Sequence, residues 1–362
     1  MDFRDVKRVL IYRLGSLGDT AVALPALHLV ERTFPNARRV LLTNIPIQSK
    51  APAAQAILEG SGLVHDYMAY PVGTRSVREL LALWWRIRRL RPQVVVYLMA
   101  SRGERAVRRD AGFFHLYGAQ RIIGLPVGDL AENQFDPATN LWESEASRLL
   151  RCIRPLGEAD VADLRNWDLR LTLAEQERAA KELAGIDGNP FIIAAIGGKF
   201  QTTDWGTENW QSLLRTLSAR MPLHLLVMVG AQEDHAASEI ASAHWPRKTV
   251  NLCGRLSPRE TAAVAARAEL FLGRDSGPKY LAAVGGVPCA IVYSARNRPG
   301  IWFPPGQVHR NVFHNVDCAN CNLAVCVEQR KKCITGITVD EMLTAAMEAW
   351  KNGQRARESR LA

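Results

Sequence analysis

One stretch of the chain indicates its fold more clearly than any other: GRDSGPKYLAAVGGVP, at residues 273–288. The apolar run before it, at 268–272, is typical of a buried strand, and residues 278–283 are expected to begin a helix. Ser276 is the expected N-cap, and Pro278 suits the first helical position. A tight turn between a strand and a helix N-terminus gathers backbone N–H groups and the positive end of the helix dipole, which favours a phosphate or diphosphate ligand. For this turn alone, the alternative is a well-capped helix with nothing bound.

Strands and helices alternate along the rest of the chain. Short apolar runs predict strands at 9–12, 40–42, 94–98, 122–125, 191–195, 223–229, 250–252, 270–272 and 290–293. Helical periodicity predicts helices at 20–33, 77–90, 210–220, 234–244 and 257–267. This alternation predicts an α/β fold with parallel sheets covered on both faces. In such sheets, ligands bind beyond the carboxyl ends of the strands.

The length of 362 residues predicts two domains. A polar, acidic stretch with several glycines separates two rounds of the strand and helix pattern, at residues 157–190. We therefore expect an N-terminal domain at 1–185 and a C-terminal domain at 186–362, the latter containing a Cys-rich segment at 318–333.

The composition, with 48% hydrophobic and 23% charged residues, is that of a soluble globular protein. No uncharged run is long enough to cross a bilayer, and the first residues lack the apolar core of a signal peptide. The cytoplasm is therefore the expected location. The net charge of +10 is concentrated at residues 70–121, which hold eleven arginines and three acids. This favours an anionic partner (a phosphorylated substrate, an acidic membrane surface or nucleic acid), and the alternative is a solvated basic helix face.

A second glycine turn follows the first strand, RLGSLGD at residues 13–19, with LPAL after it at 24–27. Together with DSGP at 275–278 and the GVP at 286–288, it resembles the paired motifs of glycosyltransferase family 9, the ADP-heptose:lipopolysaccharide heptosyltransferase family. The resemblance covers roughly residues 6–350. It implies a GT-B architecture, in which two Rossmann-like domains face each other across a cleft. It also implies an inverting transfer from a nucleotide-diphosphate sugar, with no cofactor or metal required for catalysis.

Inverting transfer needs a base to take the proton of the acceptor hydroxyl, and the resemblance assigns that role to Asp19. From spacing alone, Asp19 is better explained as the N-cap of a helix that begins at Thr20, and the resemblance shifts the preference to the base. The acceptor is expected to contact the N-terminal domain, at Arg13, Gly18, Arg102 and Arg105.

The donor diphosphate is expected in the C-terminal domain, on the N–H groups of Ser276 and Gly277. Asp275 is expected to orient that turn or to contact the donor sugar. Glu233 corresponds to a family position that binds the nucleoside, and its alternative is to stabilise the helix that follows it.

The chain departs from the family pattern at three positions. Thr203 stands where the family has a lysine that contacts the donor phosphate. We expect Thr203 in the donor site, with the missing charge supplied by Lys199, Lys279 or Arg274. Tyr280 replaces a histidine of the C-terminal motif, and Tyr97 stands where an acid is often found. These departures leave the donor sugar open.

Four cysteines lie close together in the sequence and are candidate ligands of a structural Zn or Fe ion: Cys318, Cys321, Cys326 and Cys333. The alternative is a set of reduced thiols in an irregular loop.

Tryptophan and arginine alternate on one predicted helix, in WWRIRRLR at residues 84–91. Such a stretch suits the surface of an anionic inner membrane, where rings lie at the headgroup level. We expect instead that the tryptophans pack inward, while the arginines after the next strand line the acceptor side.

These observations favour a glycosyltransferase that moves a sugar, with heptose from ADP-heptose the favoured donor, onto a lipopolysaccharide-core or related glycan or glycolipid acceptor. Peripheral contact with the inner face of the cell membrane is compatible with this function. The alternatives are a GT-B epimerase or hydrolase of the same donor class, a nucleotide-binding protein without turnover, and a nucleic-acid-binding protein. Nucleic acid is not expected, because no recognised binding module is present.

Overall fold

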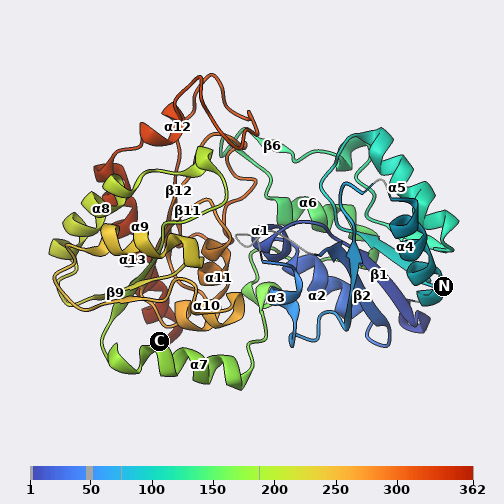
Figure 1. The fold of residues 1–362 in the computed structure, drawn as a ribbon, viewed down its shortest axis with the longest axis horizontal. Coiled ribbons are helices and arrows are strands. Elements are labelled where there is room, and N and C mark those ends of the chain that lie inside the picture. The colour runs from blue at the N-terminus through green and yellow to red at the C-terminus, as the bar shows by residue number, and fades with distance from the viewer. Residues whose placement is uncertain (1–2, 46–51, 75, 187, 362) are drawn as a thin grey trace. The chain divides into compact units, whose positions relative to one another are not determined.

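The computed structural model describes residues 3–45, 52–74, 76–186 and 188–361. Within them the chain forms two compact units, residues Met1–Arg170 (unit 1) and Leu171–Ala362 (unit 2). Each unit is an α/β structure built on a parallel sheet, as the sequence predicts (Figure 1). The division between the units precedes the expected one at 185/186, because helix α7 (Leu173–Leu183) packs against α10 (Pro258–Ala265) of unit 2.

Unit 1 contains a sheet of five parallel strands in the order β3-β2-β1-β4-β5. The strands are β1 (Arg8–Tyr12), β2 (Arg38–Asn44), β3 (Asp66–Tyr70), β4 (Val94–Tyr97) and β5 (Arg121–Ile123). Its helices are α1 (Leu17–Ala21), α2 (Leu24–Thr33), α3 (Gln55–Leu58), α4 (Val77–Leu90), α5 (Glu104–Leu116) and α6 (Glu145–Cys152). A small antiparallel pair joins β6 (Phe135–Asp136) and β7 (Leu141–Trp142).

The single helix expected at 20–33 is two helices, α1 and α2, in the structure. Pro25 is the physical reason, because it has no backbone N–H to continue a hydrogen-bonded ladder from α1. It is tolerated where it lies, in the first turn of α2. The helix thus restarts after α1, and Leu24 and Leu27 of α2 are buried.

Unit 2 contains six parallel strands in the order β10-β9-β8-β11-β12-β13. The strands are β8 (Phe191–Ala195), β9 (Leu225–Met228), β10 (Thr249–Asn251), β11 (Leu270–Arg274), β12 (Cys289–Val292) and β13 (Arg310–Val312). The remaining helices are α8 (Thr207–Arg220), α9 (His235–Ser242), α11 (Pro278–Val284), α12 (Lys332–Thr335) and α13 (Val339–Leu361).

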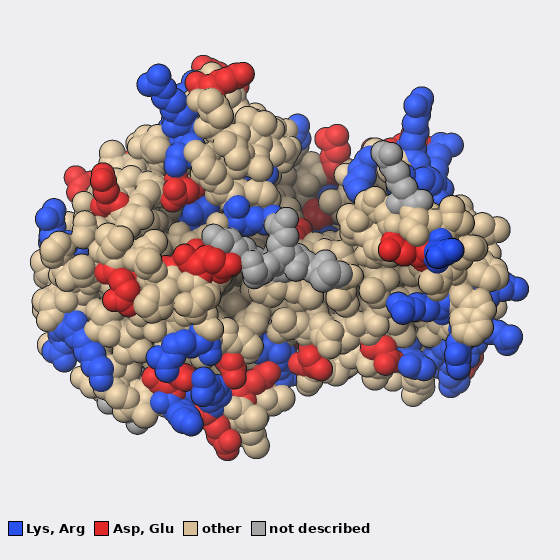
Figure 2. Space-filling view, viewed as in Figure 1, with Lys and Arg blue, Asp and Glu red and all other residues tan. Residues whose placement is uncertain are grey.

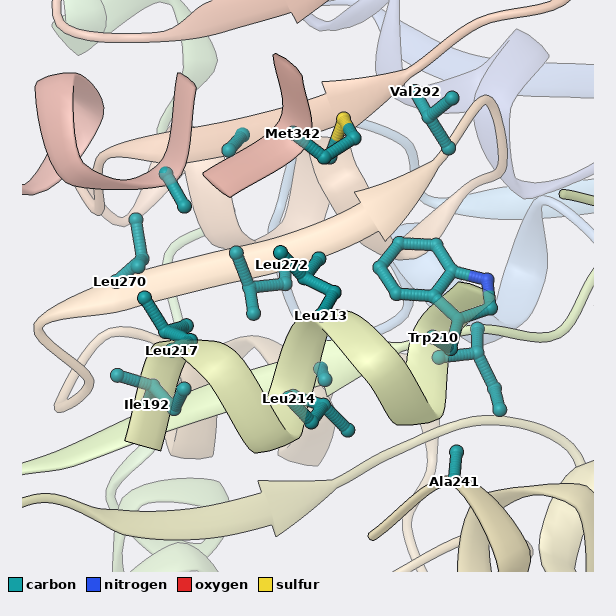
Figure 3. Close-up of a cluster of buried hydrophobic side chains, with 14 of the residues drawn as sticks. Ile192, Trp210, Leu213, Leu214, Leu217, Ala241, Leu270, Leu272, Val292 and Met342 are labelled. Atoms are coloured by element: carbon teal, nitrogen blue, oxygen red, sulfur yellow. The ribbon is translucent and has the colours of Figure 1, made fainter. Parts of the chain in front are cut away.

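Helices α8 and α13 cover one face of this sheet with apolar side chains. Figure 3 shows Leu213 of α8 and Met342 of α13 beside Leu272 of β11 in the same buried cluster. Because β11 is buried along its whole length, the turn that follows it is held in place by packing on both sides.

Candidate active site

The turn after β1 is shaped by the close approach of Asp19 to Gly15. A Cβ atom at Gly15 would lie 2.2 Å from the Cβ of Asp19, and the φ of Gly15 is +142°. A side chain at this position would therefore collide with Asp19 in a backbone conformation that L residues rarely adopt.

One oxygen of the Asp19 carboxylate is hydrogen-bonded within this turn. Its Oδ2 atom accepts hydrogen bonds from the backbone N–H of Ser16 at 2.8 Å and from the Ser16 hydroxyl at 3.2 Å. Ser16 is the N-cap of α1 and Asp19 is its third residue, so the prediction of Asp19 as an N-cap is wrong. The Oδ1 atom accepts no hydrogen bond from any residue that the structure describes, and the side chain is 35% exposed.

Arg13 holds the backbone of Asp19 in place through hydrogen bonds. Its guanidinium donates to the backbone carbonyl of Asp19 at 2.9 and 2.7 Å and to the carbonyl of Leu98 at 2.6 Å. The side chain is only 4% exposed. Arg13 was expected to contact the acceptor, but in this structure its donors are used within unit 1, and it acts as a positioning residue for the turn.

A buried ion pair on α6 lies beside Arg13 and was missed by the sequence reasoning. Glu145 accepts two hydrogen bonds from Arg148, both at 2.8 Å, and lies 3.6 Å from the Nη1 of Arg13. Arg148 also donates to the carbonyl of Met99 at 3.0 Å. The only sequence signal was an acid and an arginine three positions apart on a helix, a pattern that also occurs on exposed surfaces.

The other residues expected on the acceptor side divide into two groups. Gly18 lies in α1, beside Asp19. Arg102 and Arg105 follow β4, which neighbours β1 in the sheet, so both groups lie at the same edge. Arg105 is exposed, whereas Arg102 is paired with Asp110 at 2.5 Å.

The residue Tyr97 replaces an acid in the family pattern, yet a carboxylate is present against it. Asp110 of α5 accepts a hydrogen bond from the Tyr97 hydroxyl at 2.9 Å, and both side chains are buried. Burial raises the pKa of Tyr97 to about 12, which keeps the phenol neutral. A carboxylate is thus present beside position 97 after all, but it comes from Asp110 on α5, and this contact cannot be read from the sequence.

In unit 2, the expected donor residues lie on loops that follow three neighbouring strands. Lys199 follows β8, Glu233 follows β9, and the turn at 275–277 follows β11. These strands are adjacent and parallel in the order β9-β8-β11, so the three loops emerge at one edge of the sheet. Glu233 and Lys199 are both exposed there.

The turn after β11 is built on a buried ion pair. The carboxylate of Asp275 accepts a hydrogen bond from the ammonium group of Lys279, which is 1% exposed and lies 4.7 and 4.9 Å from the ring centres of Tyr280 and Tyr293. Lys279 is therefore enclosed and does not replace the missing phosphate lysine. Asp275 thus bonds to the first turn of α11, and its expected contact with the donor sugar stays a prediction.

The N-cap of α11 is Gly277, not the expected Ser276. The Ser276 hydroxyl donates instead to the carbonyl of Arg274 at 3.4 Å. Gly277 already has helical φ and ψ of −55° and −42°, so the helical conformation begins before the position that the sequence indicated.

Thr203 and Arg274 contact each other beneath the loop after β8. The Arg274 guanidinium donates to the Thr203 hydroxyl at 2.5 Å and to the carbonyl of Phe200 at 2.6 Å, and both Thr203 and Arg274 are buried. Neither side chain reaches the surface in this structure. Of the three cations expected to replace the family lysine, only Lys199 is exposed.

Asp234 is a further acid at this edge that the sequence reasoning missed. A Cβ atom at Gly197 would lie 2.0 Å from the carboxyl carbon of Asp234. Its Oδ2 accepts a hydrogen bond from the backbone N–H of Ala231 at 3.1 Å. The loops after β8 and β9 are thus in direct contact, and Gly197 permits that contact.

The four clustered cysteines share one irregular segment. Burial and the negative charges of Cys318, Cys321 and Cys326 raise the pKa of the Cys333 thiol, so the four sulfurs lie within one another's electrostatic field. Thiolates are the ligands that zinc and iron–sulfur chemistry prefer, so the donor set fits such an ion. Across the described ranges, however, no three His, Cys, Asp or Glu side chains converge closely enough to hold a metal.

The helix α4 exposes part of its apolar surface. Leu83 and Ile87 are buried, and Trp84 packs against Tyr117, but Trp85 is 58% exposed. The expectation that both tryptophans pack inward is therefore wrong for Trp85. In the part of the chain that the structure describes, no helix is both long and apolar enough to span a membrane.

The family model described as glycosyltransferase family 9 (heptosyltransferase) matches residues 153–332. A comparison with curated protein sequences returned no match.

Several solved structures share the fold over nearly the whole chain. The glycosyl transferase family 9 protein from Veillonella parvula DSM 2008 is 16% identical, with a TM-score of 0.68 over 97% of this chain and 99% of that chain. The E. coli ADP-heptose LPS heptosyltransferase II is 14% identical, with a TM-score of 0.66 over 96% and 99%. The iron-containing dodecameric glycosyltransferase TibC from enterotoxigenic E. coli H10407 is 13% identical, with a TM-score of 0.55 over 98% and 78%. Residues 153–332 therefore form a glycosyltransferase family 9 (heptosyltransferase) domain, the solved structures share the fold of the chain, and the chain is a glycosyltransferase.

Proposed function

We propose that this protein is an inverting glycosyltransferase that moves heptose from ADP-heptose onto a lipopolysaccharide-core or related glycolipid acceptor. The observation that carries the proposal is the arrangement of Asp19. Its Oδ2 atom is held by Ser16, whereas Oδ1 accepts no hydrogen bond from a described residue, lies 4.0 Å from the Nη2 atom of Arg13, and belongs to a side chain that is 35% exposed. A positioned, partly exposed carboxylate with an oxygen that accepts no hydrogen bond is what a general base for an acceptor hydroxyl requires.

The base takes the proton as the acceptor oxygen attacks the anomeric carbon from the face opposite the departing diphosphate. The bond from the anomeric carbon to the diphosphate oxygen then breaks, and the configuration at that carbon inverts. Arg13 keeps Asp19 in register by holding its backbone carbonyl. No cofactor takes part in these steps.

The diphosphate of the donor is assigned to the edge of unit 2 where the loops after β8 and β11 emerge. Lys199 supplies an exposed positive charge, and the N–H groups of Ser276 and Gly277 supply donors. Glu233, exposed after β9, is assigned to the nucleoside. ADP-heptose is favoured as the donor because a solved relative of the same fold is named for that substrate.

We propose that unit 1, which carries the expected acceptor residues, binds an anionic membrane surface through the exposed face of α4. Opposite the buried Leu83 and Ile87, this helix presents Leu81 and Trp85, each 58% exposed, between Arg78, Arg88 and Arg89. Among the described residues, no arginine of α4 forms an ion pair. Figure 2 shows Lys and Arg side chains gathered over the part of unit 1 where Figure 1 places α4 and α5. The exposed ring of Trp85, with the guanidinium of Arg89 5.5 Å from its centre and further arginines beside it, suits the headgroup region of an anionic bilayer.

We further propose that the four cysteines hold a structural Zn or Fe ion. Support comes from the chemistry of the four thiols and from the iron named for the relative TibC. Such an ion would order the Cys-rich segment and would take no part in transfer.

The deciding experiment measures release of ADP from ADP-heptose by the purified protein, with and without a heptose-deficient lipopolysaccharide acceptor. The proposal expects ADP release that depends on the acceptor, with the new glycosidic bond inverted by NMR. It also expects Asp19→Asn to lose turnover while it still binds ADP. Glu158→Gln, an exposed acid of unit 1, is the matched control and should retain turnover. Release without acceptor would indicate a hydrolase, and no binding of ADP by the folded wild type would overturn the proposal.

A further inference from the structure

The loop after β12 carries an arginine, Arg296, close to the turn that is proposed to hold the donor diphosphate. Strand β12 pairs with β11, so the loops that follow these two strands emerge at the same edge of the sheet. The two sequence neighbours of Arg296 line one pocket together with Asp275 of that turn. These neighbours are Ala295 and Asn297. The loop after β12 therefore borders the proposed diphosphate site.

The guanidinium of Arg296 is held in one orientation by two carbonyls and one ring. Its Nε donates to the carbonyl of Leu323 and its Nη2 to the carbonyl of Asn322, both at 3.0 Å. Its Cζ atom lies 4.3 Å from the ring centre of Phe200. A planar cation that donates along its edge and stacks on its face suits arginine and not lysine. The guanidinium is thus fixed by contacts within unit 2 alone.

These contacts leave the positive charge of Arg296 without an ion pair. Carbonyls and an aromatic ring carry no net charge, and among the residues that the structure describes Nη1 donates no hydrogen bond. Burial lowers the pKa of Arg296, and the negative charge of Asp275 opposes that fall, which places the guanidinium within the electrostatic reach of Asp275. Arginine stays protonated at neutral pH all the same. A fixed guanidinium with an unused N–H group suits a phosphate oxygen.

The exposed Lys199 contacts the same ring as Arg296. The ammonium of Lys199 lies 5.3 Å from the ring centre of Phe200, whose carbonyl accepts a hydrogen bond from Arg274 at 2.6 Å. Two cations, one from the loop after β8 and one from the loop after β12, therefore meet at one aromatic side chain. Thr203, which stands at the position of the family lysine, is buried and neutral. A second cation is thus available where the family pattern lacks one.

The order of the strands indicates which part of the donor lies nearest to Arg296. Along β9-β8-β11-β12, the loop with Glu233, which is proposed for the nucleoside, follows the first strand, and the loop with Arg296 follows the last. The turn that is proposed for the diphosphate follows β11, between them. A donor laid along this edge with its nucleoside at β9 brings its sugar-bearing β-phosphate toward β12.

We propose that Arg296 binds the β-phosphate of the donor and stabilises the departing diphosphate during transfer. The acceptor oxygen forms the new bond to the anomeric carbon with its own electron pair, and its proton passes to Asp19. The bond from the anomeric carbon to the β-phosphate oxygen breaks, and its electron pair stays on the released nucleoside diphosphate. The negative charge of that leaving group rises by one, while Arg296 stays protonated and meets the charge. This inference rests on the proposed donor site and assigns to it a catalytic residue.

The binding test uses the purified full-length protein and needs no acceptor. Calorimetry measures the Kd for ADP and the Kd for AMP, which lacks the β-phosphate. Arg296→Ala should raise the Kd for ADP on the order of tenfold and leave the Kd for AMP within about twofold of the wild type. Arg296→Lys keeps the charge but loses the planar contacts, so its Kd for ADP should lie between the two.

Turnover of ADP-heptose tests the effect on the chemical step. The kcat of Arg296→Ala should fall about 10²-fold, because the charge on the leaving group develops in the transition state. Added guanidinium ion should restore part of the kcat of Arg296→Ala, since it supplies the missing charge at the vacated position. A loss of loop structure would not be rescued in this way.

Two control variants separate the charge of Arg296 from the order of its loop. Thr202→Val removes a hydroxyl that donates to the same Leu323 carbonyl at 2.9 Å, so it weakens the tie between the segments without changing the charge. Arg220→Ala removes a positive charge at the exposed end of α8. Both variants should bind ADP as the wild type does. Circular dichroism establishes that each variant is folded, and Arg296→Lys serves in place of Arg296→Ala where the latter does not fold.

The outcomes separate this inference from the proposed function. If the wild type binds ADP and Arg296→Ala has the same Kd and kcat, Arg296 has no role and the donor site stands. Equal weakening of ADP and AMP, or an equal loss in Thr202→Val, would assign Arg296 to the structure of the loop and overturn the phosphate contact. If the folded wild type binds no ADP, the proposed donor site is wrong and this inference fails with it.

Discussion

The guanidinium of Arg13 donates two hydrogen bonds, at 2.9 and 2.7 Å, to the backbone carbonyl of Asp19, the residue six positions later. A side chain at the end of β1 thereby closes the turn that presents the candidate base. The same guanidinium is buried and lies 3.6 Å from Glu145. Asp19 is thus positioned through its own backbone, and its Oδ1 atom lies 4.0 Å from the same guanidinium without accepting a hydrogen bond.

Replacing the candidate base should abolish transfer and leave the donor site intact. Asp19→Asn keeps the size of the side chain but removes its ability to take a proton, so kcat should fall about 10²- to 10⁴-fold. The Kd for ADP should stay within about twofold, since the proposed donor contacts lie in unit 2. Steady-state kinetics and calorimetry on the same preparation check both values. A variant with near wild-type kcat would remove Asp19 from the mechanism.

Removing one partner of the buried network on α6 should destabilise unit 1. Glu145→Ala leaves the guanidinium groups of Arg13 and Arg148 buried without their carboxylate, a change that costs about 3–5 kcal/mol in comparable pairs. Thermal unfolding should show the loss. Glu104→Ala, which breaks an exposed pair with Arg108, is the control and should change stability by less than about 1 kcal/mol. Equal effects of the two variants would contradict the role given to the network.

The role of Asp275 in folding can be separated from any role in binding. Asp275→Asn leaves the buried ammonium of Lys279 without a charge partner and should lower the unfolding temperature. The double variant Asp275→Asn/Lys279→Met removes both charges and should recover most of that stability. ADP binding is then measured in the double variant. Recovery of stability without recovery of binding would assign Asp275 to the donor site, and recovery of both would leave it a structural role only.

His309 should make unit 2 sensitive to mild acid. Burial lowers the pKa of His309 to about 4, and the ring accepts a hydrogen bond from the N–H of Cys289 at 3.1 Å while its Nε2 lies 2.7 Å from the carbonyl of Pro305. The neutral ring suits both contacts, with Nδ1 as acceptor and Nε2 as donor.

The lowered pKa of His309 sets the direction in which stability changes with pH. Between pH 6.5 and about 4 the unfolded chain binds more protons at this histidine than the folded one. The stabilisation is therefore complete above pH 6.5 and is lost as the pH falls, by on the order of 2 kcal/mol at pH 5. Unfolding at pH 8 and pH 5 measures it. His309→Gln should have a shallower pH dependence, whereas His244→Gln, an exposed histidine, should follow the wild type. The same slope in all three proteins would exclude His309 as the cause.

The exposed face of α4 should bind anionic vesicles. The triple variant Arg78→Ala/Arg88→Ala/Arg89→Ala should weaken partitioning onto phosphatidylglycerol-rich vesicles by about 1 kcal/mol per arginine. Trp85→Ser should weaken it further, because the ring no longer enters the headgroup region. Vesicle co-sedimentation measures both, with pure phosphatidylcholine vesicles as the uncharged reference. Leu173→Ser, an exposed apolar residue of unit 2, should have no effect. Binding that favours RNA over anionic vesicles would point to a nucleic-acid partner instead.

Local patterns were enough to predict the strands and the α/β class. Apolar runs such as 191–195 and 94–98 are buried on both faces of a parallel sheet, which leaves a strong signal in the sequence. The glycine turn after β1 has a similar basis, because the close approach of Asp19 to Gly15 requires a residue without a side chain there. Helix boundaries were less accurate: Pro25 divides a helix that periodicity alone continues.

Local sequence patterns predict which loops carry Asp19, Lys199, Glu233 and Asp275, since each residue follows a recognisable strand. Which charged side chains face solvent and which are buried depends on the folded arrangement of distant elements. Lys279 and Lys199 have the same chemistry, yet Lys279 is enclosed by Asp275, Tyr280 and Tyr293 while Lys199 is exposed. The contacts of Arg13 with Glu145 and of Arg296 with Asn322 likewise join residues from separate elements. The physical reason is that hydrophobic periodicity is a local property of the chain, whereas the pairing of buried charges depends on which distant elements the fold brings together.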